Sequence, residues 1–276
     1  MAGEGRHEGA PFPPFEPGSV ERLPVPASQG TRLSEIPLRV IVPNLITIAA
    51  ICAGLTGVRL AFEGRFGLAV AFILVAAFLD AIDGRIARLM KASSRFGEQM
   101  DSLADVVNFG VAPALVAYAF LLHELFSLGW IAALVYAIAT TLRLARFNVM
   151  IDAPNQPKWQ RDFFTGVPAP AGGGLVLLPV YLGLMGVEAT PTFAWFAAIY
   201  TLVIALLMVS SLPVYSGKVS GGSVPRRWVV PLMLLLVIYS AMLVSYEWIT
   251  LTLTALAYLA FLPVSARMYR RRAREG

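Results

Sequence analysis

The sequence predicts an all-α protein, a polytopic bundle of about eight transmembrane helices whose two termini lie in the cytoplasm. Three observations lead to this prediction: the composition, the lengths of the apolar runs, and the positions of the basic residues. Of the 276 residues, 57% are apolar and 14% are charged, whereas about a quarter of the residues in soluble proteins are charged. The mean hydropathy is +0.69. An integral membrane protein is therefore expected.

The chain is expected to begin with a disordered tail. Residues 1–33 are rich in Pro, Gly, Ser and charge, and they contain no apolar stretch long enough for the core of a signal peptide. A single transmembrane domain is expected over residues 34–268, followed by a short basic tail over residues 269–276.

Apolar runs then recur at lengths near the ~20 residues that an α-helix needs to cross the membrane hydrocarbon. They fall at about 41–62, 66–89, 98–122, 127–148, 167–186, 192–212, 228–245 and 248–267. Short connections, such as residues 63–65, predict that neighbouring helices are antiparallel.

The basic residues give these spans an orientation, because cytoplasmic loops carry the excess of Lys and Arg. With both termini inside, nearly all basic residues fall on the cytoplasmic side, and only Arg59 and Arg65 remain for the other side. The basic cluster at 267–274 directly follows the last predicted span, so anionic lipid headgroups are its expected partners. The net charge of +5 is thus explained without a nucleic-acid partner.

Four aspartates lie within two of these apolar spans. The pattern is Asp80-x2-Asp83-Gly84-x2-Ala87-Arg88-x8-Gly97-x3-Asp101-x3-Asp105, called the signature below. At 3.6 residues per turn, its first five fixed residues line one stripe of a helix and its last three line a second stripe. Two such stripes facing each other across a short loop would bring the four carboxylates together near the inner membrane surface.

A charged residue at the centre of a spanning helix costs ~2.5–3.5 kcal/mol, so these carboxylates need partners. Carboxylate oxygens suit Mg²⁺ or Mn²⁺, and four of them can bridge two such ions in a site suited to phosphoryl or phosphodiester transfer. Two alternatives remain open from the residues alone. One is a surface charge network with Arg85, Arg88 and Arg95, and the other is an ion pathway, as in a divalent-cation transporter.

The signature resembles, at all eight fixed positions, that of the CDP-alcohol phosphotransferases. This resemblance implies a membrane-embedded helical bundle, usually a homodimer, that transfers a phosphatidyl or related group from a CDP-linked donor to an alcohol and releases CMP. It also implies a bacterial-type inner membrane with the active site facing the cytoplasm. The resemblance implies that two Mg²⁺ or Mn²⁺ ions are bound by Asp80, Asp83, Asp101 and Asp105. It further implies that Asp105 is a candidate general base. The residues that it implies as CDP contacts are Gly84, Ala87, Arg88 and Gly97.

A second group of polar residues bears on the acceptor. Arg143 and Arg146 lie three residues apart at the end of the fourth predicted span, with Asn148 close by. Their guanidinium groups could bind a phosphate or a carboxylate as forked donors. Spacing alone equally allows a positive-inside anchor.

Four stretches resemble those of bacterial and archaeal phosphatidylserine synthases, and this similarity covers residues of about 40–220. They are Pro43–Thr47, Arg143–Asn148, Phe164–Pro168 with Pro170, and Leu207–Ser210 followed by Tyr215-Ser216-x-Lys218. The resemblance implies transfer from CDP-diacylglycerol to L-serine, with Arg143, Arg146, Asn148 and Lys218 contacting the acceptor or a phosphate. Direct attack is expected, because no activated Ser, Cys or His stands near the signature. A sister transferase that uses choline, glycerol phosphate or inositol phosphate is the alternative.

Overall fold

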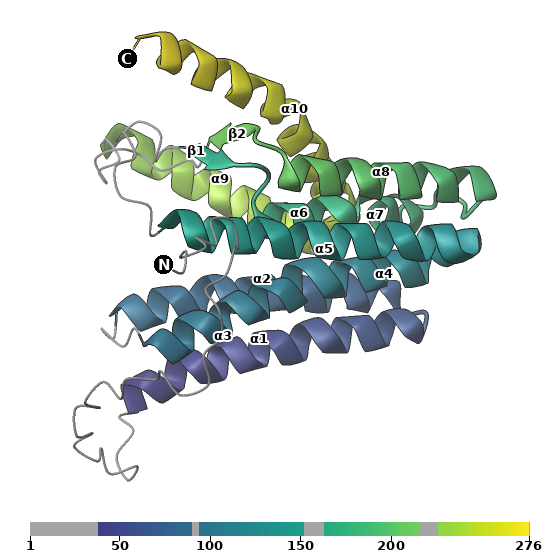
Figure 1. Ribbon diagram of the computed structural model, residues 1–276, viewed down its shortest axis with the longest axis horizontal. Helices are drawn as coiled ribbons and strands as arrows, with labels where there is room; N and C mark the ends of the chain where they lie inside the picture. The colour runs from purple at the N-terminus through teal and green to yellow at the C-terminus, as the bar shows by residue number, and fades with distance from the viewer. Residues whose placement is uncertain (1–37, 90–93, 152–162, 216–225, 276) are drawn as a thin grey trace, which may run out of the picture. The chain divides into compact units, whose positions relative to one another are not determined.

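The computed structural model describes residues 38–89, 94–151, 163–215 and 226–275. Residues 37–276 form one compact unit by their contacts. The predicted tail at 1–33 lies outside the described residues. The elements are α1 (Leu38–Phe62), α2 (Phe66–Leu89), α3 (Arg95–Asp105), the π-helix η1 (Val106–Val111), α4 (Ala112–Phe120), the 3₁₀-helix η2 (Leu122–Leu125), α5 (Phe126–Ile151), β1 (Phe163–Thr165), α6 (Ala169–Val176), α7 (Leu178–Leu184), α8 (Pro191–Val209), β2 (Pro213–Tyr215), α9 (Arg226–Ser245) and α10 (Glu247–Glu275) (Figure 1).

Within this described part, seven helical segments are long and apolar enough to cross a membrane. They correspond to seven of the eight predicted spans, as expected of an integral membrane protein. The one remaining predicted span, at 167–186, is instead a pair of short helices, α6 and α7. Together they cover Ala169–Leu184. The last helix, α10, continues through the basic segment as far as Glu275.

Pro179 accounts for the break between α6 and α7. A proline has no backbone N–H, so the carbonyl of Leu175 loses the donor that a continuous helix would supply. The hydroxyl of Tyr200 donates to this carbonyl at 3.0 Å instead, and the hydroxyl of Tyr181 donates to the carbonyl of Gly174 at 3.0 Å. Side chains thus replace the missing backbone bonds, which a break at membrane depth requires.

The third predicted span is also not a regular helix. It consists of α3, one π-helical turn and α4, and the π turn begins directly after Asp105. Pro113 cannot donate to the carbonyl of Phe109, and the hydroxyl of Tyr136 on α5 donates to that carbonyl at 2.9 Å. This bond ties α5 to the turn that follows the signature.

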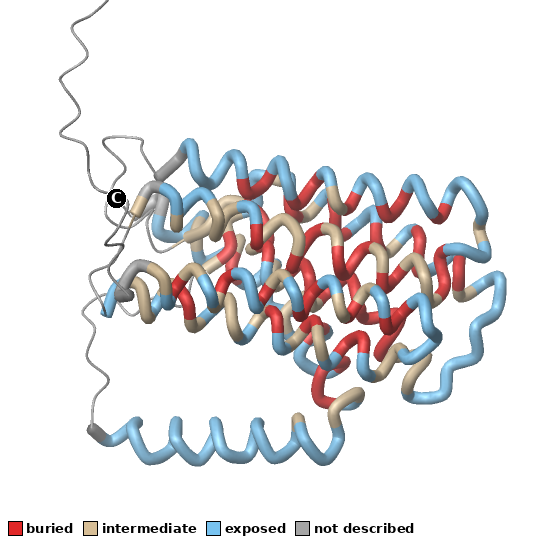
Figure 2. Tube along the Cα trace, turned by 90° about the horizontal axis from the view of Figure 1, so that it is seen from below, coloured by how far each residue is buried: buried red, intermediate tan, exposed pale blue. Residues whose placement is uncertain are grey.

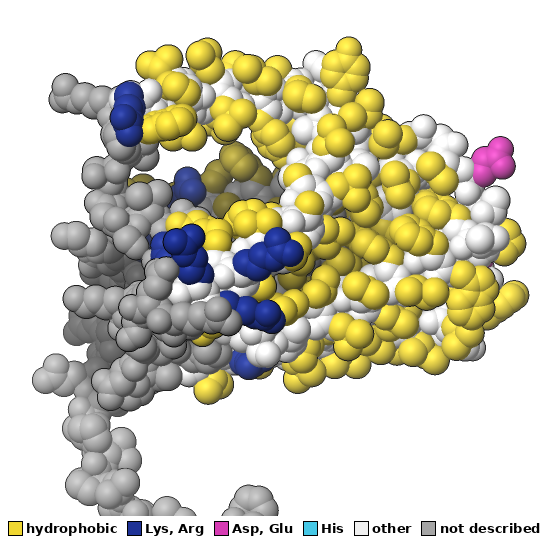
Figure 3. All heavy atoms as spheres, turned by 90° about the horizontal axis from the view of Figure 1, so that it is seen from above, with side chains coloured by type: hydrophobic (Ala, Val, Ile, Leu, Met, Phe, Trp, Pro, Cys, Tyr) yellow, Lys and Arg dark blue, Asp and Glu magenta, His cyan; other side chains and the backbone are white. Residues whose placement is uncertain are grey.

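The core lies between α1, α2, η1, α4, α5, α6 and α8, and many of its residues are alanines. Small residues allow close approach of the helices: a Cβ on Gly57 of α1 would lie 2.9 Å from the carbonyl oxygen of Ala69 on α2. In contrast, α9 is exposed along nearly its whole length (Figure 2). Figure 3 shows one face covered mostly by hydrophobic side chains, with Lys and Arg gathered toward one end. A lipid-facing surface is expected to have this distribution.

Candidate active site

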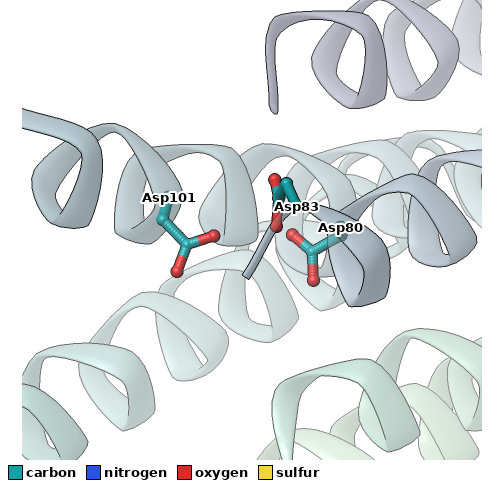
Figure 4. Close-up of side chains that lie close together, drawn as sticks. All are labelled: Asp80, Asp83 and Asp101. Carbon is teal, nitrogen blue, oxygen red and sulfur yellow. The ribbon is translucent and has the colours of Figure 1, made fainter. Parts of the chain in front are cut away.

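Three aspartates from two helices meet at one point. Asp80 and Asp83 are three residues apart on α2, and Asp101 faces them from α3 (Figure 4). One carboxylate oxygen from each lies within 4.8 Å of the others. Asp83 is only 2% exposed, and the other two are half-buried. The two helical stripes that the spacing predicts therefore face each other.

Asp105, one turn beyond Asp101 on α3, is the fourth member of this acidic cluster. Its carboxylate and that of Asp80 interact electrostatically, as do its carboxylate and that of Asp101. Carboxylates gathered in this way repel one another unless a proton or a cation offsets their charge. The four acids together, referred to below as the acidic cluster, are thus arranged around a position that favours positive charge.

The residues present fit divalent cations. The Oδ1 atoms of Asp80 and Asp83 are buried and have no hydrogen-bond partner in the described part of the chain. Among the described residues, no Lys or Arg forms an ion pair within 4.0 Å of any acid in the cluster. Arg85 and Arg88, members of the charge network considered above, are exposed, and the side chain of Arg95 lies outside the described residues. Buried carboxylates normally need a counter-charge, and hard oxygen ligands suit Mg²⁺ or Mn²⁺.

Thr47 holds one carboxylate of the cluster in place. Its hydroxyl lies 2.7 Å from Asp83 Oδ2 and 3.1 Å from the carbonyl oxygen of Pro43. The hydroxyl has one proton, and the shorter bond to the charged acceptor is the stronger of the two. Thr47 is itself 4% exposed. It lies in a stretch singled out in the sequence, but its contact with Asp83 was not predicted.

Replacing Thr47 by Val is expected to lower the rate of catalysis about tenfold, because partners that orient metal ligands typically contribute about 10–100-fold. Val keeps the shape of Thr but leaves Asp83 Oδ2 without its donor. The measurement is kcat in membranes or detergent at saturating substrate and metal. Thr47→Ser, which keeps the hydroxyl, is the matched control, and equal losses in both variants would contradict the assigned contact.

A cavity of about 300 Å³ opens beside the cluster. It is lined by Pro43, Asn44, Thr47, Asp83, Gly84, Ala87, Arg88, Ser94, Gly97, Glu98 and Asp101. The four residues that the resemblance connects with CDP all line this cavity. A Cβ on Gly84 would meet no atom within 4 Å, so the glycine leaves open space next to the carboxylates. The cavity is at the lower end of the ~300–1,000 Å³ that ligand pockets occupy.

Three of the four predicted acceptor contacts lie in the described part of the chain, each beside a different neighbour. Arg143 is buried, with its guanidinium 5.4 Å from the centre of the Phe147 ring. Arg146 is exposed and donates to the carbonyl oxygen of Val209 at 3.3 Å. Asn148 donates to Ser102 Oγ on α3 at 3.0 Å. Lys218 lies outside the described residues.

Two further buried polar residues were not predicted as site residues. Asn108, in the π turn after Asp105, is fully buried, and neither of its amide atoms has a partner among the described residues. Tyr258 on α10 has a buried hydroxyl, also without a partner there. Both positions lie in apolar runs, where single polar residues are most simply expected to face other helices.

Residues 40–203, more than half of the chain, match the CDP-alcohol phosphatidyltransferase family. The chain belongs to this family. A second match, to CDP-alcohol phosphatidyltransferase 2, covers residues 227–263. The family resemblance of the signature is thereby confirmed.

Individual members of the family are also similar over most of the chain. A protein of Mycobacterium leprae is 41% identical over 223 residues, which are 81% of this chain and 73% of the relative. One of Mycobacterium bovis is 39% identical over 234 residues, 83% and 79% of the two chains. One of Helicobacter pylori is 37% identical over 140 residues, 51% and 57% of the two chains. Each of the three is named CDP-diacylglycerol–serine O-phosphatidyltransferase.

Proposed function

We propose that this family member transfers a phosphatidyl group from CDP-diacylglycerol to L-serine, giving phosphatidylserine and CMP. The observation that carries the proposal is the acidic cluster beside a cavity lined by the rest of the signature. Two of its buried carboxylate oxygens have no hydrogen-bond partner among the described residues. The names of the similar mycobacterial and Helicobacter proteins support serine as the acceptor. The proposed site faces the cytoplasm from a bacterial inner membrane, and the proposed assembly is a homodimer.

In the proposed mechanism, two divalent cations would be held by Asp80, Asp83, Asp101 and Asp105. When bound, they would neutralise phosphate charge and stabilise the entering and leaving oxygens. Gly84, Ala87, Arg88 and Gly97 would position the nucleotide in the cavity, where Gly84 leaves room for a phosphate close to the backbone.

Asp105 is the proposed general base. As the serine hydroxyl attacks the phosphorus that bears diacylglycerol, its proton passes to an Asp105 carboxylate oxygen. A new O–P bond forms while the P–O bond to CMP breaks, and CMP leaves with the electron pair. A single displacement is proposed because neither Ser94, which lines the cavity, nor Ser102, which follows Asp101, is hydrogen-bonded among the described residues to a base that would activate it. Their hydroxyl oxygens accept from the Gly97 backbone N–H and from the Asn148 amide.

The test uses the purified full chain in detergent or liposomes. CMP release from CDP-diacylglycerol is measured with serine, choline, glycerol phosphate and inositol phosphate, each with Mg²⁺, with Mn²⁺ and with chelator. We expect release that requires metal and is fastest with serine. A faster reaction with another alcohol would instead identify a sister transferase. Metal flux into vesicles without any release of CMP would favour a transporter and contradict the proposal.

A further inference from the structure

Asn108 is a polar side chain to which the described residues offer no hydrogen bond. It lies in the π-helical turn that directly follows Asp105, and it is fully buried. Neither the nitrogen nor the oxygen of its amide has a partner among those residues. A buried amide without partners is unfavourable, and an apolar side chain of the same shape would avoid this cost. The partner of the amide is therefore expected to be a group other than the protein.

Helix α1 leaves room for this amide at Gly54. A Cβ on Gly54 would lie 2.5 Å from Asn108 Oδ1 and 3.5 Å from Asn108 Cγ, so any larger residue at position 54 would displace the amide. Glycine weakens the interior of a helix relative to alanine. The π turn that carries Asn108 is also a rare departure from the α-helix, of a kind that frequently occurs at functional sites. Two local departures from the most stable helix thus accompany one unpartnered amide.

The contacts of α1 place the amide at the inner end of the acidic cluster. Thr47 bonds Asp83, and Gly54, two turns further along the same face of α1, contacts Asn108. Because α2 runs antiparallel to α1, Asp80 lies one turn beyond Asp83 in the same direction. At 1.5 Å per residue, the amide is then about 6 Å beyond Asp80 along the helix axes. One water molecule that forms two hydrogen bonds of ~2.8 Å spans such a separation.

Water is a suitable partner for both of these groups. Asp80 Oδ1 is buried and, like the Asn108 amide, has no hydrogen-bond partner among the described residues. Buried waters typically bond about three polar groups that the protein leaves unsatisfied. A carboxylate only accepts, whereas an amide nitrogen donates, so a water can donate to Asp80 and accept from Asn108 Nδ2. Mg²⁺ also keeps several of its waters when it binds to a protein. The inner end of the cluster therefore suits ordered water.

We infer that Asn108 is a positioning residue of the metal site, whose amide holds ordered water at the inner end of the acidic cluster and thereby orients the Asp80 carboxylate. This inference rests on the proposed function, because it concerns the same site, and it adds a residue outside the signature. Asn108 itself touches neither the substrate nor the reacting atoms. It acts on Asp80 from the inner side through water, as Thr47 acts directly on Asp83 from α1.

The first variant is Asn108→Leu, which keeps the approximate shape of the side chain but removes the amide. The Kd for Mn²⁺ is measured with the purified full chain from the electron paramagnetic resonance signal of the free ion, and kcat from CMP release at saturating Mn²⁺. We expect Kd to rise and kcat to fall about tenfold each, because partners that orient metal ligands contribute about 10–100-fold. The unfolding temperature in chelator should not fall, since leucine removes an unpartnered polar group from the core.

Thr201→Val is the matched control. Thr201 on α8 is also buried, and its hydroxyl has no partner among the described residues, but it does not line the nucleotide cavity. The control should share any gain in stability from removing an unpartnered polar group, and it should leave the Kd for Mn²⁺ and kcat unchanged.

A second pair of variants separates positioning from packing. Gly54→Ala displaces the amide of Asn108 without removing it, so it should also weaken Mn²⁺ binding and should lower the unfolding temperature. In the double variant Gly54→Ala with Asn108→Ala, the new methyl group takes space that the amide vacates. We expect the double variant to regain the unfolding temperature that Gly54→Ala loses, but not the affinity for Mn²⁺ or kcat.

An unchanged Kd for Mn²⁺ in folded Asn108→Leu would overturn the inference. A double variant that regains Mn²⁺ affinity and kcat together with stability would also overturn it, because the amide would then serve packing only. If Asn108→Leu does not fold, Gly54→Ala and the double variant decide by the same criterion. A wild type that binds Mn²⁺ but releases no CMP with any acceptor would overturn the proposed function alone, whereas a wild type that binds no Mn²⁺ would overturn both.

Discussion

Replacing Asp101 by Asn is expected to lower metal-dependent CMP release at least about a thousandfold, or ~4 kcal/mol of transition-state stabilisation. Asp101 lies on α3, and its carboxylate is within 4.8 Å of those of Asp80 and Asp83. The neutral amide keeps the size of the side chain but is a weak ligand for a hard cation. The measurement is kcat/KM for CDP-diacylglycerol over a range of metal concentrations, because a weakened site can be partly restored at high metal.

The same variant should be at least as stable as the wild type when no metal is bound. Removing one charge from a buried group of like charges relieves repulsion, so function and stability are expected to oppose each other at this position. Thermal unfolding in chelator and in Mg²⁺ or Mn²⁺ tests this. In the wild type, metal at about 100 times its Kd should add ~2.7 kcal/mol of stability. In Asp101→Asn most of this gain should be lost.

Asp105→Asn is the informative companion to Asp101→Asn. If Asp105 serves mainly as the base, the variant should lose catalysis but keep most of the stabilisation by metal. If it serves mainly as a ligand, both should be lost together. Asp101→Asn with near-normal catalysis, or with unchanged stabilisation by metal, would contradict the assignment of the cluster as a metal site.

The sequence predicts this cluster well because helical periodicity is a local property. Two aspartates three residues apart on α2 must share a face, and Asp101 must lie one turn from Gly97 on α3. A short connection between two spanning helices then allows few arrangements other than antiparallel neighbours. The positions of seven long helices follow from the same local rule, because the length of an apolar run is set by the membrane.

Departures from regular helices were harder to predict, since they depend on contacts between distant residues. Pro113, after the π turn, and Pro179, at the break between α6 and α7, each leave a carbonyl without its usual backbone donor. Tyr136 and Tyr200, on other helices, supply the missing hydroxyls. Prolines occur within several spans. The sequence around a proline does not reveal whether a hydroxyl from another helix will bond to the carbonyl that the proline leaves without a donor. A continuous span was therefore predicted where α6 and α7 lie.

The acceptor side of the site illustrates the same difficulty. Spacing placed Arg143 and Arg146 on one face of a helix, yet Arg143 is buried and Arg146 is exposed. The exposed guanidinium of Arg146 donates to the Val209 carbonyl at the end of α8. Val209 is far from Arg146 in the sequence, so this contact could not be predicted from spacing.

Replacing Gly84 by Leu is expected to lower kcat/KM for CDP-diacylglycerol about a hundredfold. The leucine side chain would fill space that the substrate is proposed to occupy, at a cost of ~3 kcal/mol in transition-state stabilisation. A Cβ at this position meets no atom within 4 Å, so the side chain can enter the cavity without displacing protein atoms. The protein should therefore fold normally, and Gly84→Ala should even gain ~0.5–1 kcal/mol because alanine is the better helix former. The loss should appear mainly as a raised KM for the nucleotide lipid, with a smaller effect for Ala than for Leu.

Gly174 on α6 provides the matched control for this prediction. A Cβ there also meets no atom within 4 Å, but Gly174 is not among the residues that line the nucleotide cavity. Gly174→Leu should thus share any general effect of placing a large side chain at an open helical glycine, without the loss of nucleotide binding. Similar kinetics in the two leucine variants would show that the space beside Gly84 is not used by the substrate. A graded loss confined to position 84, with unfolding temperatures that do not fall, would instead show that this glycine is retained for the ligand, because the fold alone gives no reason to exclude a side chain there.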